Sequence, residues 1–550
     1  MWFALWKAIR LAKEKAFSRR LASLWRWDLP LSLLILAILS YSWMFSSISV
    51  PNERSRLYLT VALIDHHTLT IDEPVRRFGK INDWARYEDH YYTDKAPGSS
   101  LLGAVVYGLV RCFSNPQDWK IHELINLMRT CVMLPLGLIG FLWLRRLLRR
   151  LGLDPPSTDI TAVGWIVGTS AFHYSTAFYG HQIVAVCMIG ALDLILMAEQ
   201  RLADSLPASS ALGPAWGAGM MAGLAGLTEY QAGIPTACLL VYVVFGPMRR
   251  HGSLWLAVAL GAFPFMVMLF GYNTLAFGGP FELSYHHLID PSLRELHGKG
   301  IGGVAAPQWQ YAYGGLFSLH RGLFTTSPVF GLAVPGLIIM VLRRRVRLAI
   351  LVGMTWLYFL LFISSTQIWF AGWSFGPRLL VPVMGWVMIP IAYCFHGMGK
   401  IPVLDGLGRG LLIVGILYHQ TVHAVFPELP ESATHPFKDV IVPAWRAGVV
   451  SPNLCTKWIG WKGFASLLPL AVLLMLAVVI VVLWPKMGSS RKTMACRAAT
   501  ALGTTLLCCV PLLLIKPGWS ERESQRFIQW MEQLIAEEQR LSGKQLTASP

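Results

Sequence analysis

The chain has 550 residues, of which 54% are hydrophobic and 14% are charged, and its formal net charge is +17. A soluble protein carries about a quarter charged residues, so this composition excludes an ordinary soluble enzyme. The positive charges stand in short clusters between apolar runs, as in cytoplasmic loops, and we therefore expect no nucleic-acid partner. The long runs lack the period-2 alternation of an open or soluble β fold, and their helix-spanning length predicts an all-α polytopic membrane protein.

The chain begins with a basic segment that is followed by an apolar run at 29–49. The run is too long for the apolar part of a signal peptide, and SSISVPNE after it offers no small-residue cleavage site. We predict a retained first transmembrane helix with its N-terminus in the cytoplasm.

Apolar runs of comparable length recur along the rest of the chain. We predict twelve further transmembrane helices, at 122–144, 157–178, 182–199, 212–228, 230–246, 253–273, 327–342, 348–364, 379–396, 408–425, 463–484 and 498–515.

The orientation follows from four basic clusters, at 145–150, 249–250, 343–347 and 491–497. All four can be cytoplasmic only if the apolar segment 98–113 does not cross the membrane. At 16 residues this segment is also short for a span. We therefore predict a bundle of about 13 transmembrane helices, with 98–113 as an interfacial or re-entrant helix on the extracytoplasmic side.

This topology divides the chain into a membrane domain, 1–515, and an extracytoplasmic tail, 516–550. The tail carries a capping box, Ser520 with Glu523, and apolar residues at helical spacing, which predicts an amphipathic helix on the outer surface. The membrane domain exposes large outer regions at 51–121, 274–326, 365–378 and 426–462.

The first outer loop, 51–121, opens with PNERSRLYL. Asn52 is a candidate helix N-cap, and Glu53 and Arg56 are spaced for an ion pair on a surface helix. A carboxylate held at the membrane surface can alternatively take a proton from an acceptor hydroxyl as a general base. Both interpretations of Glu53 stay open at this point.

The same loop closes with YYTDKAPG, 91–98. Asp94 can cap the following helix, and Lys95 can extend its ammonium group to the lipid headgroups. Alternatively Lys95 binds the phosphate of a phosphorylated lipid, while Asp94 orients it or binds a cation.

Three further residues lie at predicted outer ends of helices. His181 follows the third predicted span, where a hydrogen-bonded interfacial histidine is the simpler interpretation. Arg321 and Arg378 each stand among glycine and aromatic residues just before a span, and a guanidinium in such a place can bind a phosphate.

Together these motifs resemble a known family. NERSR at 52–56, DKAPG at 94–98, FGGPFELSY at 277–285, SLHRGLFTTSP at 318–328 and WFAGWSFGPRLLVP at 369–382 are similar to bacterial membrane glycosyltransferases of the GT-C superfamily. That superfamily contains lipid A aminoarabinose transferases and protein O-mannosyltransferases, and the present chain looks like a family-39-like member. The resemblance covers most of the chain and implies a GT-C-like bundle with extracytoplasmic juxtamembrane helices.

The resemblance implies a hexosyl- or pentosyltransferase in the inner (plasma) membrane, with its active site on the extracytoplasmic side. Its donor would be a sugar on a polyprenyl phosphate, and its acceptor an envelope lipid, glycan or protein. Glu53 would activate the acceptor for an inverting displacement, while Lys95 and Arg378, with Arg321, would hold the donor phosphate.

The sequence departs from the family at two positions. Asn52 stands where many relatives have Asp, and His181 stands roughly where a second-loop Asp is common. His181 would then take a catalytic role in place of that Asp, and because a second carboxylate is missing we do not favour a divalent cation as cofactor. A secondary transporter, or a lipid-binding relative without activity, is the alternative function.

Overall fold

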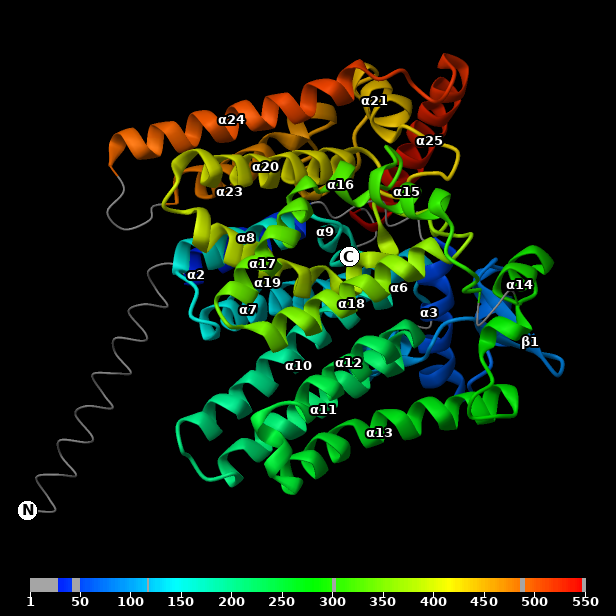
Figure 1. The fold of residues 1–550 in the computed structure, drawn as a ribbon. Helices are drawn as coiled ribbons and strands as arrows, with labels where there is room; N and C mark the ends of the chain where they lie inside the picture. The colour runs from blue at the N-terminus through cyan, green and yellow to red at the C-terminus, as the bar shows by residue number, and fades with distance from the viewer. Residues whose placement is uncertain (1–27, 42–49, 116–117, 299–302, 485–489, 547–550) are drawn as a thin grey trace, which may run out of the picture.

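Long helices lie side by side along most of the chain, and shorter elements connect them (Figure 1). The computed structural model describes residues 28–41, 50–115, 118–298, 303–484 and 490–546. The basic N-terminal segment 1–27 and the end of the predicted first helix lie outside these residues.

The helices that overlap the predicted spans form a layered bundle. They are α2 (Leu29–Tyr41), α6 (Ile121–Met128) continuing through η4 (Arg129–Met133) into α7 (Leu134–Arg150), α8 (Pro155–Gly168), α10 (Gly180–Ala203), α11 (Ser209–Thr228), α12 (Gly233–Val244), α13 (Gly252–Phe277), α17 (Ala333–Leu342), α18 (Val346–Ser364), α19 (Val381–Met398), α20 (Pro402–Val425), α23 (Leu468–Leu483) and α24 (Arg491–Leu514).

The remaining elements belong mostly to the regions that we predicted to be extracytoplasmic. They are α3 (Pro51–Val61), η2 (Ala62–His66), α4 (Asp72–Phe78), β1 (Trp84–Tyr87), β2 (His90–Thr93), α5 (Gly98–Phe113), α9 (Ala171–Tyr174), η5 (Tyr230–Ala232), η6 (Pro247–Arg250), η7 (Ser284–His287), α14 (Pro291–Gly298), α15 (Trp309–Phe317), α16 (Leu323–Thr326), η8 (Pro328–Leu332), η9 (Arg378–Leu380), η10 (Phe437–Ile441), α21 (Val442–Arg446), α22 (Leu454–Trp458), η11 (Gly463–Leu467) and α25 (Glu521–Leu546). Figure 1 shows α3, β1, α14, α15, α21 and α25 together at one end of the bundle.

The helices confirm a multi-pass membrane protein. Each of the thirteen predicted spans overlaps a helix, and seven helices among the described residues are long and apolar enough to cross a membrane. Four shorter apolar helices, α5 among them, accompany these seven. The number thirteen and the side on which α5 lies remain predictions.

Burial separates central helices from peripheral ones. The span at α19 is 94% buried inside the protein and that at α10 is 83% buried, whereas α13 and α24 are each 17% buried. α11 and α13 approach closely at glycines, since a Cβ at Gly219 would lie 2.0 Å from the carbonyl oxygen of Val258. The peripheral helices therefore present most of their surface to lipid.

The predicted span 157–178 is wrong in its extent, because α8 ends at Gly168 and only the four-residue helix α9, with irregular backbone on both sides of it, follows up to Tyr179. The last carbonyl groups of α8 are satisfied from distant parts of the chain: Gln420 Nε2 donates to Val167 O at 2.9 Å and Ser327 Oγ to Gly168 O at 3.3 Å. Irregular backbone inside an apolar bundle is stable when it is buried in protein and its polar groups are paired.

The first loop also differs from its prediction. α3 is buried on all sides instead of lying on a surface, since Glu53, Arg56 and Leu57 have no exposed area. It begins at Pro51 with Val50 as its N-cap residue, and Asn52 lies inside the first turn. A two-stranded antiparallel hairpin, which the sequence analysis did not predict, pairs Trp84 with Thr93 and so leads the chain back toward Asp94.

The predicted tail helix is present as α25. Its capping box is confirmed, since the Glu523 carboxylate accepts from the Ser520 backbone N–H at 2.8 Å. Ile528 and Met531 on its apolar face are buried against the loop around Phe426 and the short helix α21. The tail is therefore packed against the end of the bundle.

Candidate active site

Glu53 is the most enclosed of the predicted site residues. Arg129, from η4, binds both of its carboxylate oxygens, through Nε at 2.9 Å and a terminal nitrogen at 2.5 Å. The backbone N–H of Phe178 donates to the same carboxylate at 2.7 Å. Glu53 therefore does not pair with Arg56, as the spacing predicted, and both of its oxygens are engaged by the protein.

Arg56 pairs instead with Glu229, at the end of α11, at 2.6 Å. It also donates to the side chain of Asn52 and, at 3.1 Å, to the Asn52 carbonyl. His181 Nδ1 lies 3.5 Å from the same Glu229 carboxylate. Gly180 leaves room for this carboxylate, because a Cβ there would lie 2.2 Å from Glu229 Oε1.

Lys95 lies between two carboxylates, with its Nζ 2.6 Å from Asp94 and 3.0 Å from Asp83. Asp94 is not the N-cap of α5, which begins after Pro97, and it accepts a further hydrogen bond from Ser55 Oγ at 3.1 Å. Burial and the neighbouring Asp83 raise the pKa of Asp94, against the pull of Lys95. Of the two acids, Asp94 therefore holds a proton more readily.

The pKa of Asp83 indicates which cations lie near Lys95. Burial alone would raise its pKa, but the charges of Lys95, Arg378 and Arg56 bring the pKa below its usual value. Lys95, Arg56 and Arg378 are also close enough to His181 for their charges to act on it. The structure thus brings four predicted site residues, Asp94, Lys95, His181 and Arg378, into one polar cluster.

Arg378 differs from the other cations of this cluster. Within the described parts of the chain its guanidinium makes no hydrogen bond or ion pair with the protein, and its Nε is buried without a partner. The guanidinium lies 5.5 Å from the ring centre of Tyr179, whose hydroxyl is also buried without a hydrogen-bond partner. Arg378 and Tyr179, from different segments, therefore lie in contact, and each has a buried donor without an acceptor among the described residues.

Tyr179 is a site residue that the sequence analysis missed. Burial raises the pKa of its hydroxyl well above the usual value, so the hydroxyl remains a donor at neutral pH. The Arg56 guanidinium also lies over the Tyr179 ring, 5.9 Å from its centre. The signal that could have revealed it is its position next to Gly180 and His181 in FYGHQ, at the break between two apolar runs.

Arg321 lies outside this cluster and serves the loop that carries Arg378. Its terminal nitrogens donate to the carbonyl oxygens of Phe370 at 2.9 Å, Gly372 at 2.7 Å and Leu429 at 3.0 Å. Its guanidinium also donates to Ser374 Oγ, next to the bridge between Ser374 and Leu429. These bonds engage the Arg321 guanidinium with the protein. Its contact with a phosphate stays a prediction.

Replacing Arg321 by lysine is expected to lower the free energy of unfolding by at least about 2 kcal/mol, because an ammonium cannot reproduce a fork of hydrogen bonds to carbonyl groups. Thermal unfolding of the chain in lipid nanodiscs measures this, with Arg343→Lys, at an exposed arginine, as the matched control. If Arg321→Lys is as stable as the parent chain, the hydrogen bonds of Arg321 do not stabilise the fold, and its guanidinium would be available for a ligand.

A buried acid and histidine form a second group near the cluster. His173 Nε2 lies 3.1 Å from Glu428 Oε1, outside hydrogen-bond geometry, and both side chains are almost completely buried. No three His, Cys, Asp or Glu side chains among the described residues are arranged to hold a metal ion. Metal independence of the site stays a prediction.

Solved structures give the comparison for this fold, since no protein-family model and no curated protein matches the sequence. ArnT from Cupriavidus metallidurans bound to undecaprenyl phosphate is similar with a TM-score of 0.50 and 16% identity, over 90% of this chain and 77% of ArnT. Its apo structure gives a TM-score of 0.49, with the same identity and coverage. The oligosaccharyltransferase AglB from Archaeoglobus fulgidus, in complex with an inhibitory peptide and a dolichol-phosphate, gives 0.47 and 13% identity, over 86% of this chain and 56% of AglB. At these identities the likeness shows the fold alone: the chain has a fold like that of ArnT, in agreement with the GT-C-like bundle that the sequence motifs predicted.

Proposed function

We propose that the chain is a glycosyltransferase that moves a sugar from a polyprenyl-phosphate carrier to an acceptor on the extracytoplasmic side of the plasma membrane. The observation that supports this most is the pair of donors without an acceptor, Arg378 and Tyr179. A guanidinium with a buried, unpaired Nε beside a buried hydroxyl is satisfied by an anion. A carrier-lipid phosphate is the anion that a membrane enzyme of this fold would use.

The phosphate would lie between Arg378 and Lys95. Both side chains are partly accessible, whereas Arg56 and Arg129 are buried in ion pairs with acids. As the acceptor oxygen bonds to the anomeric carbon, the bond from that carbon to the phosphate oxygen breaks, and negative charge grows on the departing phosphate. Fixed cations beside that oxygen stabilise this charge strongly, because little water screens it.

The proton of the acceptor needs a carboxylate. The family resemblance implied Glu53 for this role, but both of its oxygens are engaged, by the Arg129 guanidinium and the Phe178 backbone N–H. Asp83 has a lowered pKa and a side chain that is 22% exposed. We assign the general base to Asp83 and a positioning role to Glu53, which holds Arg129 and the backbone next to Tyr179.

The test is transfer of a radiolabelled sugar by the purified chain in nanodiscs. A panel of undecaprenyl-phosphate-linked sugars serves as donors, and an envelope glycolipid extract serves as the acceptor. We expect label to move for at least one donor, and to move at least about 100-fold more slowly in Asp83→Asn, as expected for the loss of a general base. Arg343→Ala, at an exposed arginine, is the matched control.

Three outcomes would contradict the proposal. Substrate flux in proteoliposomes without any lipid-linked sugar would identify a transporter. Binding of undecaprenyl phosphate with no turnover on any acceptor would identify a lipid-binding protein. Full transfer by Asp83→Asn would remove Asp83 from the role of base.

A further inference from the structure

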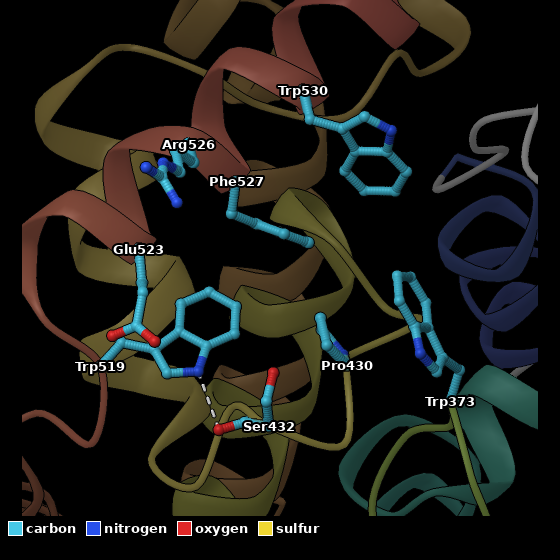
Figure 2. A pocket seen from close by; sticks show the side chains of 8 residues that line it. All are labelled: Trp373, Pro430, Ser432, Trp519, Glu523, Arg526, Phe527 and Trp530. Atoms are coloured by element: carbon cyan, nitrogen blue, oxygen red, sulfur yellow. Dashed lines mark hydrogen bonds between the residues drawn. The ribbon is translucent and has the colours of Figure 1, made fainter.

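A pocket of about 360 Å³ lies between α25 and two loops at the same end of the bundle as α3 (Figure 2). Nothing in the candidate active site uses it. Figure 2 shows its aromatic rings around the opening and its two charged side chains on one edge. The aromatic residues are Trp373, Trp519, Phe527 and Trp530, and the charged ones are Glu523 and Arg526.

The aromatic rings are held in place by the protein. Trp519 Nε1 donates to Ser432 O at 2.8 Å. The ring of Trp530 meets that of Trp373 edge to face at 6.1 Å and that of Phe527 at 5.2 Å. Trp373 nevertheless stays 41% exposed. The pocket thus offers fixed apolar faces that are open to a ligand, with little entropy to lose on binding.

The two charged side chains add a donor and an acceptor next to these faces. Ser520 engages Glu523 through Oε2, which leaves Oε1 for another partner. Arg526, three residues later on α25, is exposed, and its guanidinium supplies up to five N–H donors. A pyranose ring combines an apolar face of C–H groups with a rim of hydroxyl groups, which matches this combination of ring faces, carboxylate and guanidinium.

The pocket shares a loop with the candidate active site. Trp373 precedes Arg378 by five residues on the segment that Arg321 ties to Leu429, and Pro430, the next residue, also lines the pocket. A group bound at Trp373 is therefore held on the same fixed loop as the candidate phosphate ligand.

We propose that this pocket is an acceptor subsite, which binds one pyranose unit of a glycan acceptor. The proposal rests on the proposed function and narrows its acceptor from lipid, glycan or protein to a molecule that carries a saccharide. The other interpretation is an aromatic belt, in which tryptophan rings stabilise the protein at the membrane interface and bind no saccharide.

The test measures saccharide binding without any donor. The full chain in nanodiscs of phosphatidylethanolamine and phosphatidylglycerol is applied to an array of immobilised bacterial oligosaccharides. We expect binding to a subset of saccharides, and about 10-fold weaker binding for Arg526→Ala and for Trp373→Ala, since each loses one contact to the ligand. Trp458→Ala, at a tryptophan that is 81% exposed and lies outside the pocket, is the matched control and should bind as the parent chain does.

Two comparisons separate this proposal from the function on which it rests. Binding should persist in Arg378→Ala, because the donor phosphate takes no part in it; loss of transfer with retained saccharide binding would therefore concern the active site alone. Conversely, transfer whose KM for the acceptor is unchanged in Arg526→Ala and Trp373→Ala would overturn the subsite. So would the absence of binding to every saccharide, or an effect of Trp373→Ala on melting temperature without one on binding.

Discussion

Arg378→Ala is expected to lower the rate of sugar transfer at least about 100-fold, as removal of one donor to a developing anion does in other enzymes. The physical reason is that the Arg378 guanidinium, among the described residues, lies over the Tyr179 ring without a hydrogen bond or ion pair, so its loss leaves no directly paired acid behind. Stability should therefore change little while activity falls. Initial rates with a lipid-linked donor, together with the melting temperature in nanodiscs, measure both effects.

Two further variants serve as comparisons in this experiment. Arg378→Lys keeps the charge but not the planar fork, and we expect an intermediate rate. Arg343→Ala, at an exposed arginine, should transfer at the parent rate. If Arg378→Ala retains full activity and full binding of undecaprenyl phosphate by native mass spectrometry, the phosphate does not lie at Arg378.

Glu53→Gln is expected to destabilise the chain by about 3–5 kcal/mol, because it removes the partner of a buried charge. Arg129 would then face a neutral amide in place of the carboxylate that binds two of its nitrogens. Arg129→Met should be destabilising by a similar mechanism. The double variant should lose less stability than the sum of the two single losses, as expected for a buried pair in direct contact.

Denaturant unfolding in mixed micelles for the four proteins gives this cycle. The result separates two roles of Glu53 that the sequence left open. A positioning role requires the coupling in stability, with activity falling as the folded fraction falls. A Glu53→Gln protein with parental stability and no transfer would instead restore Glu53 as the general base and remove Asp83 from that role.

The motifs around the active site were predicted as members of one cluster, but their partners were not. DKAPG predicted Asp94 as a helix cap, or as the residue that orients Lys95; in the fold Asp94 caps no helix and forms an ion pair with Lys95. The spacing of Glu53 and Arg56 predicted a mutual pair because local spacing was the only information; in the fold each pairs with a residue 76 or 173 positions away. Such contacts depend on how helices pack, which a single sequence does not state.

The bundle itself was predictable, because a chain that spans a lipid bilayer needs long apolar runs, with basic clusters in its cytoplasmic loops. Asp193, inside the predicted span 182–199, pairs with Arg146 and Arg150 of the basic cluster at 145–150, on α7. The end of α8 was not predictable, since residues 157–178 read as one apolar run. Thr169, Ser170, Ser175 and Thr176 inside that run are the only local hints, and Thr176 bonds to the His173 carbonyl at 2.9 Å.

The break after α8 also bears on how the chain is inserted into the membrane. The carbonyl groups at its end are covered by Ser327 and Gln420, and Tyr174 donates to the carbonyl of Phe375. All three partners are synthesised more than 150 residues later than the segment they cover. Until they arrive, an open backbone at this depth would be costly in lipid, so the nascent chain should keep 169–179 helical or at the interface. The candidate phosphate site at Tyr179 and Arg378 would thus take its final form only when α19 and α20 join the bundle.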